Sequence, residues 1–457
     1  MSTETLASTA SAEFAGSRPR LRRELGLRDL TLFAISCVCS ARWVPIAAHA
    51  GPSSLVLWLL AAVFFMAPLA IAVGTLVAKY PHTGGLYLWA RCDFGRWNGF
   101  LCFWTYWVGI AFMFPTAALL YTKVGLSLFG PTLARLSEQR IFVLGATLGL
   151  IWSALGLNLI GLKFGKWVEN LGGLSTWIVG LLLICVAGLI WMRQGSATAP
   201  SLVPSWNWQT LSFFAAIAYA TSGMEGPGMM AGEMRDPERM MRRAGWIASG
   251  FATAFYVTAT GALLVILPPE QISELNGFAD VGNRAGQLLG AAWLSPLIAV
   301  LVLAGGVGLI GGVGTATSRL PFAPSVDGLL PKAFRSVHPR WGTPHWSTLA
   351  LGVVATLLLI MCQLGDTLRA AYDELVSLMV ITGFIPYLYI FASTWKAGRR
   401  VSALSGLATT LLALLCAVVP PPEIEKVWLF EGKLALGTLA VVVSAWILYE
   451  RSTRTRI

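Results

Sequence analysis

Residues 213–237 decide how this chain folds, and they read FFAAIAYATSGMEGPGMMAGEMRDP. The segment begins as an apolar stretch that favours a helix, but Gly223 and Gly228 flank Pro227 near its middle. Proline removes a helical hydrogen bond and glycine lowers helix stability, so we expect the helix to unwind there. Glu225 lies inside the predicted break. Burying a charge is costly, so a carboxylate at this place indicates a function.

A second stretch, near the amino terminus, has the same character. Residues 30–51 read LTLFAISCVCSARWVPIAAHAG, and Ser40, Ala41 and Arg42 precede Pro45. We therefore predict a second unwound helix, which again holds an ionisable residue, Arg42. For a single helix of this kind, a bend without any ligand is the alternative interpretation.

The composition places both stretches in a membrane protein. Of 457 residues, 56% are hydrophobic and 12% are charged. Soluble domains carry roughly 25% charged residues, about twice the fraction in this chain. The mean hydropathy is +0.68. These values exclude an ordinary soluble enzyme, a disordered protein and a nucleic-acid-binding domain.

Twelve apolar stretches are each long enough to cross a hydrocarbon core, which takes about 20 helical residues. Backbone groups must be satisfied within the membrane, so we expect all twelve to be helices in an all-α integral membrane fold. The stretches lie near residues 28–49, 53–78, 98–125, 141–161, 170–192, 209–234, 242–267, 286–318, 345–363, 373–394, 402–420 and 431–450. The two interrupted helices are therefore the first and the sixth spans.

The positive charges predict how the spans are oriented. The net charge of +11 comes from 33 Lys and Arg against 22 Asp and Glu. Loops on the side of the amino terminus carry 24 of the Lys and Arg, loops on the other side carry eight, and Arg42 lies within a span. By the positive-inside rule, both termini are cytoplasmic. We expect residues 1–24 and 451–457 to be cytoplasmic tails, and residues 25–450 to form one domain in the cell membrane.

The two interrupted spans stand five positions apart in the chain. A unit with an odd number of spans, repeated once, must be inverted in the membrane. We therefore predict inverted repeats at about 28–192 and 209–394, followed by two peripheral spans within about 402–450. Helices broken at mid-membrane, at matching positions of inverted repeats, indicate a transporter binding site. Half-helix amino ends favour a carboxylate, and carboxyl ends favour an ammonium or a metal cation, so a zwitterionic amino acid fits this pattern.

Four stretches carry a family resemblance. They are LGLRDLTLF at 25–33, KYPHTGGLYLWARCDFG at 79–95, IAYATSGMEGPGMMAGEMRDPER at 217–239 and SRLPFAPSVDGLLPKAFRSVHPRWGTP at 318–344. Over about residues 24–450 the chain resembles the amino acid–polyamine–organocation (APC) transporter superfamily. The resemblance implies the LeuT-type fold and secondary transport of an amino acid or related amine by alternating access. We therefore expect a transporter and not an enzyme, with no cofactor. The sequence contains no nucleotide-binding motif, which argues against a primary ATP-driven pump, and its histidines have no metal spacing.

The resemblance assigns substrate contacts to both breaks. Family members usually have Gly-Ser-Gly in the first break, where backbone amides hold the substrate carboxylate, but this chain has Ser40, Ala41 and Arg42. Either Arg42 binds a carboxylate through its bidentate fork, or it fills a site that no longer takes a standard amino acid. Arg42 and Glu225 also form a candidate ion pair when no substrate or proton separates them.

In the sixth span, Tyr219 matches an aromatic residue that caps the substrate, and Glu225 matches a gate or substrate-site glutamate. Tyr87 matches an inner-gate tyrosine, and Tyr387 is a further gate candidate. Ordinary packed aromatics are the alternative for Tyr219 and Tyr87. The substrate site implied by the resemblance consists of Ser40, Ala41, Arg42, Tyr219, Ser222, Gly223 and Glu225.

Several driving ions are compatible with the sequence. Proton-coupled relatives often carry a lysine in the fifth span, where this chain has Thr176. Glu225 is the other candidate proton carrier, because burial favours a neutral carboxylate. The hydroxyls of Thr315 and Thr317 are candidate sodium ligands, since sodium prefers hard oxygen atoms. Exchange without any ion is the third option.

Two other functions compete with amino acid transport. A polyamine or organic cation carrier fits the charge of Glu225 but is opposed by the charge of Arg42. A membrane substrate sensor would bind without transporting. The expected partners are a small-molecule substrate and the lipid bilayer, and no nucleic acid.

Two further expectations concern packing. Gly308 and Gly312 are spaced as GxxxG in the eighth span, which predicts a close approach to the first span. Asp373 and Glu374 open the predicted tenth span, which suggests solvated carboxylates at a helix amino terminus.

Overall fold

A computed structural model describes residues 26–81, 84–128, 136, 139–160, 162–199, 201, 208–229, 231, 234, 236–341, 343–362, 368–420 and 426–454. Helices joined by turns and loops form this part of the chain, as expected for an all-α fold. The predicted tail at 1–24 lies outside the described residues. At the other end, the last helix continues to Arg454, past the predicted end of the domain at residue 450.

The helices follow one another along the chain with mostly short connections. Up to residue 194 they are α2 (Leu27–Val38), α3 (Trp43–His49), α4 (Ser53–Ala61), the π-helix η1 (Ala62–Met66), α5 (Ala67–Lys79), α6 (Gly85–Phe94), α7 (Arg96–Ser127), α9 (Arg140–Ile160) and α10 (Leu162–Gln194). The remaining ones are α11 (Trp208–Ala220), α12 (Glu225–Gly228), α13 (Pro237–Ile266), the short 3-10 helix η3 (Pro269–Gln271), α14 (Gly277–Leu289), α15 (Leu294–Thr317), α16 (Phe322–Val326), η4 (Lys332–Arg335), α17 (His345–Cys362), α18 (Leu368–Lys396), α19 (Arg400–Val418) and α20 (Val427–Arg454).

Many of these helices have the length and apolarity of membrane spans. Nine helical runs among the described residues meet that test, and the bent pair α2 and α3 makes ten if it counts as one span. A shorter apolar helix covers His345–Met361. Such a set of helices indicates a multi-pass membrane protein. The count of twelve spans and the inverted repeat stay predictions.

The first interruption lies between α2 and α3. α2 ends at Val38, α3 begins at Trp43, and the two axes are bent by 45°. Pro45 occupies the first turn of α3, where a helix has no intrahelical partner for its N–H groups. The proline is therefore tolerated as a helix start and prevents α2 from continuing into α3.

The second interruption lies between α11 and α12. α11 ends at Ala220 and α12 begins at Glu225, with Pro227 in its first turn. Gly223 has a φ of +111°, and a Cβ at this residue would lie 2.5 Å from the carbonyl oxygen of Cys37. Only glycine allows both this backbone conformation and this close approach to α2. The two interrupted segments are thus in direct contact.

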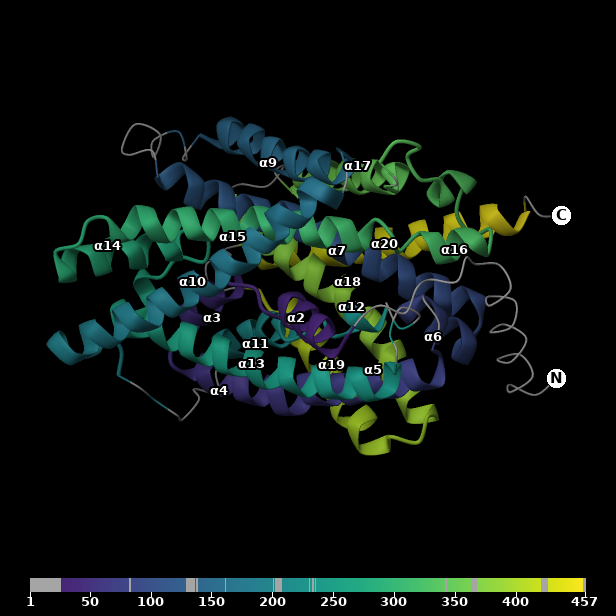
Figure 1. Cartoon of the computed structure of the whole chain (residues 1–457), viewed down its shortest axis with the longest axis horizontal. Helices are drawn as coiled ribbons and strands as arrows, with labels where there is room; N and C mark the ends of the chain where they lie inside the picture. The colour runs from purple at the N-terminus through teal and green to yellow at the C-terminus, as the bar shows by residue number, and fades with distance from the viewer. Residues whose placement is uncertain are drawn as a thin grey trace.

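Longer helices surround the interrupted segments. In Figure 1, α2, α3 and α12 lie in the middle of the molecule, with α13 on one side and α15 on the other. α2 packs mainly on α13, and α12 contacts α2, α5 and α6. The site formed by the breaks is therefore enclosed by the bundle.

Two helices lie in regions that we expected to be part of other elements. α14 is a separate helix at Gly277–Leu289, so the eighth span begins at Leu294 and not near residue 286. The loop predicted between the second and third spans contains α6, whose residues Leu86–Ala90 are buried. The hydrophobic pattern of the chain did not separate these short helices from their neighbours.

Both packing expectations were wrong. A Cβ on Gly172 of α10 would lie 2.5 Å from the Cα of Gly308, so the GxxxG face of α15 packs against α10, with which α15 has its most extensive contact. α18 begins at Leu368, and Asp373 and Glu374 are each only 5% exposed. The Glu374 carboxylate binds the Lys433 ammonium of α20 at 2.6 Å. Tertiary partners in both cases overrode the local pattern.

Candidate functional site

The Glu225 carboxylate is buried at the start of α12 and accepts three well-placed hydrogen bonds. Glu225 is only 1% exposed. The hydroxyls of Tyr106 and Tyr387 donate to Oε1 at 2.9 and 2.8 Å, and the backbone N–H of Gly223 donates to Oε2 at 3.1 Å. Glu225 is therefore joined to α7 and α18, and the predicted gate residue Tyr387 does lie beside it.

The Arg42 guanidinium is buried at the other break, with much weaker partners. The residue is 6% exposed. Nη1 donates to the hydroxyl of Thr116 at 3.4 Å and Nη2 to the sulfur of Met379 at 3.5 Å, whereas Nε has no hydrogen-bond partner among the described residues. The guanidinium carbon lies 4.3 Å from the centre of the Trp43 ring. This cation–π contact is not a hydrogen bond, and it leaves part of the guanidinium N–H edge unused.

The predicted ion pair between Arg42 and Glu225 is not formed in this structure. Arg42 contacts α7 and α18 through Thr116 and Met379, while Glu225 binds tyrosines of the same two helices. The ion pairs between described residues involve other side chains, such as Lys79 with Asp93 and Arg91 with Asp327. The two buried charges thus occupy separate environments within one region of the bundle.

Tyr256 of α13 connects the two breaks. Its hydroxyl donates to the carbonyl oxygen of Val38 at 2.7 Å and of Ala220 at 3.2 Å, which are the last residues of α2 and α11. The same oxygen accepts a hydrogen bond from the backbone N–H of Ser40 at 3.0 Å. The Trp58 ring stacks on the Tyr256 ring at 4.2 Å and fixes its orientation. One hydroxyl proton is therefore shared between carbonyl groups at the ends of both helices.

The remaining predicted substrate contacts lie along the same breaks. Ala41 is buried, and Ser222 N–H donates to the Tyr219 carbonyl at 3.0 Å. The Tyr219 ring packs edge-on against Trp43 and Phe384. Tyr219 thus lies next to the Trp43 ring that the Arg42 guanidinium contacts.

A small pocket lies on the α3 side of the first break. It encloses about 50 Å³ and is lined by Ile46, Phe213, Glu274, Asp373 and Val380 among others. Val380 follows Met379, the residue that contacts Arg42. By the predicted topology this pocket is on the external side of the site.

Tyr87, the other gate candidate, lies in a different network. Its hydroxyl donates to the Asp327 carboxylate, which also binds the Arg91 Nε at 3.0 Å. Arg96 Nη2 donates to the Asp327 backbone carbonyl at 3.0 Å. Burial, and then the negative charge of Asp327, raise the pKa of Tyr87 above its ordinary value, so this hydroxyl stays protonated. The network fastens α6 to the chain that follows α16.

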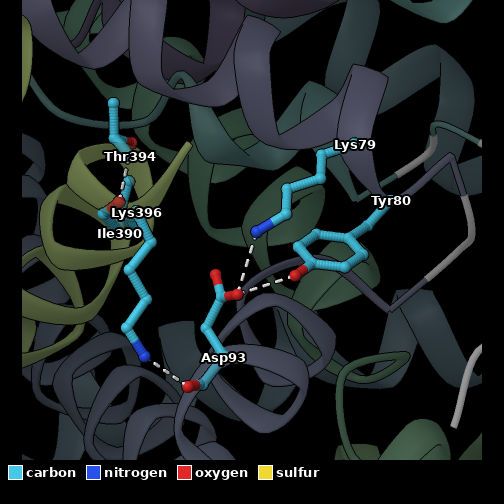
Figure 2. A network of polar contacts seen from close by, with 6 residues as sticks. All are labelled: Lys79, Tyr80, Asp93, Ile390, Thr394 and Lys396. Carbon is cyan, nitrogen blue, oxygen red and sulfur yellow. Dashed lines mark hydrogen bonds and ion pairs between the residues drawn. The ribbon is translucent and has the colours of Figure 1, made fainter. Parts of the chain in front are cut away.

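The other end of α6 is also fixed to its surroundings (Figure 2). Asp93 Oδ1 accepts from the Lys79 ammonium at 2.9 Å and from the Tyr80 hydroxyl at 2.7 Å. Lys396, the last residue of α18, donates to the Asp93 backbone carbonyl at 2.6 Å. α6 therefore connects the ends of α5 and α18 at the predicted cytoplasmic side.

A comparison with protein-family models shows to which family the chain belongs. The family model of amino acid permeases matches residues 25–446. The chain belongs to the amino acid permease family. Its relatives in the APC superfamily are transporters, and the permease is accordingly a multi-pass membrane transport protein.

Several curated relatives align with most of the permease. An uncharacterized transporter of Legionella pneumophila is 26% identical, over 94% of the permease and 97% of the relative. The probable agmatine/putrescine antiporter AguD of Lactococcus lactis is 22% identical, over 95% of the permease and 97% of the relative. The putrescine transporter PotE of Escherichia coli is 25% identical, over 76% of each chain.

A solved structure supports the fold. The crystal structure of MhsT in complex with L-phenylalanine matches the permease with a TM-score of 0.57, covering 93% of the permease and 100% of that chain. The sequence identity is 15%, so the match shows the LeuT-type fold and carries no information on the substrate.

The ion-coupling candidates differ in how their hydroxyls are bound. Thr176 and Thr315 donate to carbonyls of their own helices, Gly172 at 3.1 Å and Gly311 at 3.0 Å. The Thr317 hydroxyl is buried and has no hydrogen-bond partner among the described residues. Those residues contain no group of three His, Cys, Asp or Glu that could hold a metal ion.

Sequence reasoning missed Tyr106, Tyr256 and Asp327. Tyr106 and Tyr256 are ordinary residues of long apolar segments, with no neighbouring motif that marks them. Asp327 was within the quoted 318–344 stretch, and its position near the GGLY segment could have been inferred only from a fold. These residues contribute through contacts with helices that are distant in the sequence.

Proposed function

We propose that the permease is a secondary active carrier of an amino acid or a closely related amine, and not an enzyme. It acts in the plasma or inner cell membrane with both termini in the cytoplasm. Substrate binds between the breaks that separate α2 from α3 and α11 from α12. Alternating access to this site from the two sides moves the substrate across the membrane.

The observation that carries this proposal is the contact of the two breaks around two buried charges. Gly223 lies against the Cys37 carbonyl, and Tyr256 binds the last residue of each preceding helix. Arg42 and Glu225 are nearly inaccessible there. Intramembrane charges are costly, and a pair of them at interrupted helices fits a transport site better than a bend.

The proposed gates are Tyr87, Glu225 and Tyr387. Tyr387 of α18 donates a hydrogen bond to Glu225 and so links α18 to α12, while Tyr219 of α11 caps the substrate beside Trp43. Tyr87 acts at a distance, by holding α6 to Asp327 at the predicted cytoplasmic end. Release of substrate into the cytoplasm requires this network to open.

Counterflow in proteoliposomes tests the proposal. Vesicles preloaded with an unlabelled amino acid should take up the labelled form of the same compound, and protein-free vesicles should not. A membrane sensor that binds without transporting gives ligand-dependent stabilisation but no exchange. That result would refute the carrier and retain the binding site.

Two ions are candidates for the driving force. Glu225 is the group that could carry a proton, and the buried Thr317 hydroxyl is the stronger of the α15 candidates for a sodium ligand. Uptake measured without sodium, and separately with the pH gradient collapsed, distinguishes them. Uptake that survives both treatments indicates exchange.

A polyamine or organic cation carrier is the second candidate. Two relatives are named for transport of putrescine or of agmatine and putrescine. A dication would pair with Glu225, but it would have to enter beside Arg42. Counterflow of labelled putrescine, compared with that of labelled L-ornithine, tests this alternative on the same vesicles.

A further inference from the structure

We propose that the permease recognises its substrate chiefly through a carboxylate that binds the Arg42 guanidinium, and that amines without a carboxylate are poor ligands. The inference rests on the proposed function, because it assumes that substrate binds between the breaks. It adds the chemical class of the substrate and the group that selects it.

The first reason is that Arg42 retains unused hydrogen-bonding capacity. A guanidinium has five N–H donors, and here one meets a hydroxyl at 3.4 Å and one meets a thioether at 3.5 Å. The Thr116 hydroxyl is a neutral acceptor that is itself bonded to its own helix, and sulfur accepts weakly. Nε has no partner among the described residues. A buried cation with such partners is a strong binding site for a carboxylate.

The second reason is that the Glu225 carboxylate is already engaged. Tyr106, Tyr387 and the Gly223 N–H supply three donors at 2.8 to 3.1 Å. A substrate ammonium would have to displace or crowd these donors before it could bind. The negative charge of this region is therefore less available than the positive one.

The third reason concerns the carbonyl ends of the interrupted helices. These groups would attract an ammonium, but the Tyr256 hydroxyl already donates to the carbonyls of both Val38 and Ala220. The Ala218 carbonyl accepts from Thr221, through its N–H at 3.1 Å and its hydroxyl at 2.7 Å. These carbonyl groups therefore already accept hydrogen bonds from neutral donors, which lowers their attraction for a cation.

The geometry around Arg42 also suits a planar anion. The guanidinium carbon lies over the Trp43 ring, 4.3 Å from its centre, and Tyr219 packs edge-on against Trp43. This contact restricts movement of the guanidinium, whose planar fork suits a bidentate carboxylate. Lysine in the same place would supply charge without this planar fork.

Matched ligand pairs test the inference on purified wild-type permease. Each amino acid is compared with the amine that remains when its carboxylate is removed: L-ornithine with putrescine, L-arginine with agmatine, and L-leucine with 3-methylbutylamine. Binding is measured by calorimetry and by thermal stabilisation. We expect at least one amino acid to bind about tenfold or more tightly than its amine, because a site that loses its hydrogen-bonding partner discriminates strongly.

Variants assign the preference to Arg42. R42Q should reduce the ratio within the preferred pair to about threefold or less, and R42K should retain an intermediate ratio. R454Q is the matched control, since Arg454 is an 83% exposed arginine at the end of α20, and it should leave the ratio unchanged. The wild-type comparison stands without any variant, so poor folding of R42Q does not remove the test.

The outcomes separate the inference from the function on which it rests. Equal or tighter binding of the amines to the wild type would overturn the inference, while counterflow of those amines would keep a carrier. Absence of both binding and counterflow for every probe would overturn the inference together with the proposed function.

Discussion

The two breaks hold opposite charges in contrasting surroundings. Glu225 accepts hydrogen bonds at 2.8 to 3.1 Å from two tyrosines and a backbone N–H, whereas Arg42 donates at 3.4 and 3.5 Å to a hydroxyl and a sulfur. Both residues are buried to a similar degree. Burial alone therefore does not determine whether a charged residue supports the packing or binds a ligand. Glu225 is built into the packing of the bundle, while Arg42 is left with capacity for a ligand.

The largest expected effect is that of E225A. The change leaves the hydroxyls of Tyr106 and Tyr387 and the N–H of Gly223 without their acceptor, which should lower the free energy of unfolding by roughly 3 kcal/mol. Uptake should be lost as well. Denaturant unfolding in detergent measures the first effect, and the matched control is E450A, which removes a carboxylate exposed on α20. If E225A were as stable as the wild type, Glu225 would not be a structural residue, and the contrast with Arg42 would be wrong.

Y256F should have the next largest effect on stability. The variant keeps the aromatic ring that stacks on Trp58 but loses the hydroxyl that bonds Val38, Ala220 and Ser40. We expect a loss of about 2 kcal/mol in the free energy of unfolding. The freed carbonyls should also make amines bind more tightly relative to amino acids. Weaker amine binding to Y256F than to the wild type would show that the hydroxyl does not block a cation.

R42Q tests the contrast between Arg42 and Glu225, because we expect it to change stability only slightly. Because its partners are long and weak, replacing Arg42 should alter the free energy of unfolding by no more than about 1 kcal/mol. Uptake should nevertheless fall sharply. A melting curve without ligand measures this, and a loss of stability as large as that of E225A would mean that Arg42 is as structural as Glu225.

The smallest effect is expected at the predicted cytoplasmic end. In K79Q the Asp93 carboxylate keeps its bond from Tyr80, and the lost ammonium is partly exposed. The expected loss is about 0.5 kcal/mol, decreasing further at high salt, since exposed ion pairs are screened. Unfolding measured at low and high ionic strength tests it, and a large loss that is insensitive to salt would contradict the expectation.

The breaks could be predicted because they depend on local chemistry. Pro45, Pro227 and Gly223 restrict the backbone wherever they occur, so their positions in apolar stretches indicate where helices are interrupted. The charges of Arg42 and Glu225 were visible because so few charges lie in those stretches. The all-helical class followed from the long apolar stretches, and the transporter family from the resemblance of four stretches to the APC superfamily.

The partners of those residues could not be predicted in this way. Tyr106 and Tyr256 reach the breaks from distant helices, and many tyrosines in apolar segments look the same in sequence. The GxxxG face of α15 had two plausible partners, and the pattern of small residues does not specify which helix approaches. Asp373 and Glu374 were misjudged because the start of α18 lies earlier than the apolar stretch suggests.

An experimental structure of the permease with its preferred amino acid bound tests the central claim most directly. The account predicts ligand density between the two breaks, with a carboxylate at a charge-assisted distance of about 2.8 Å from the Arg42 guanidinium. Glu225 should keep its bonds to Tyr106 and Tyr387. Ligand density in the pocket beside Glu274 and Asp373 alone, or an ammonium as the group nearest to Arg42, would contradict it.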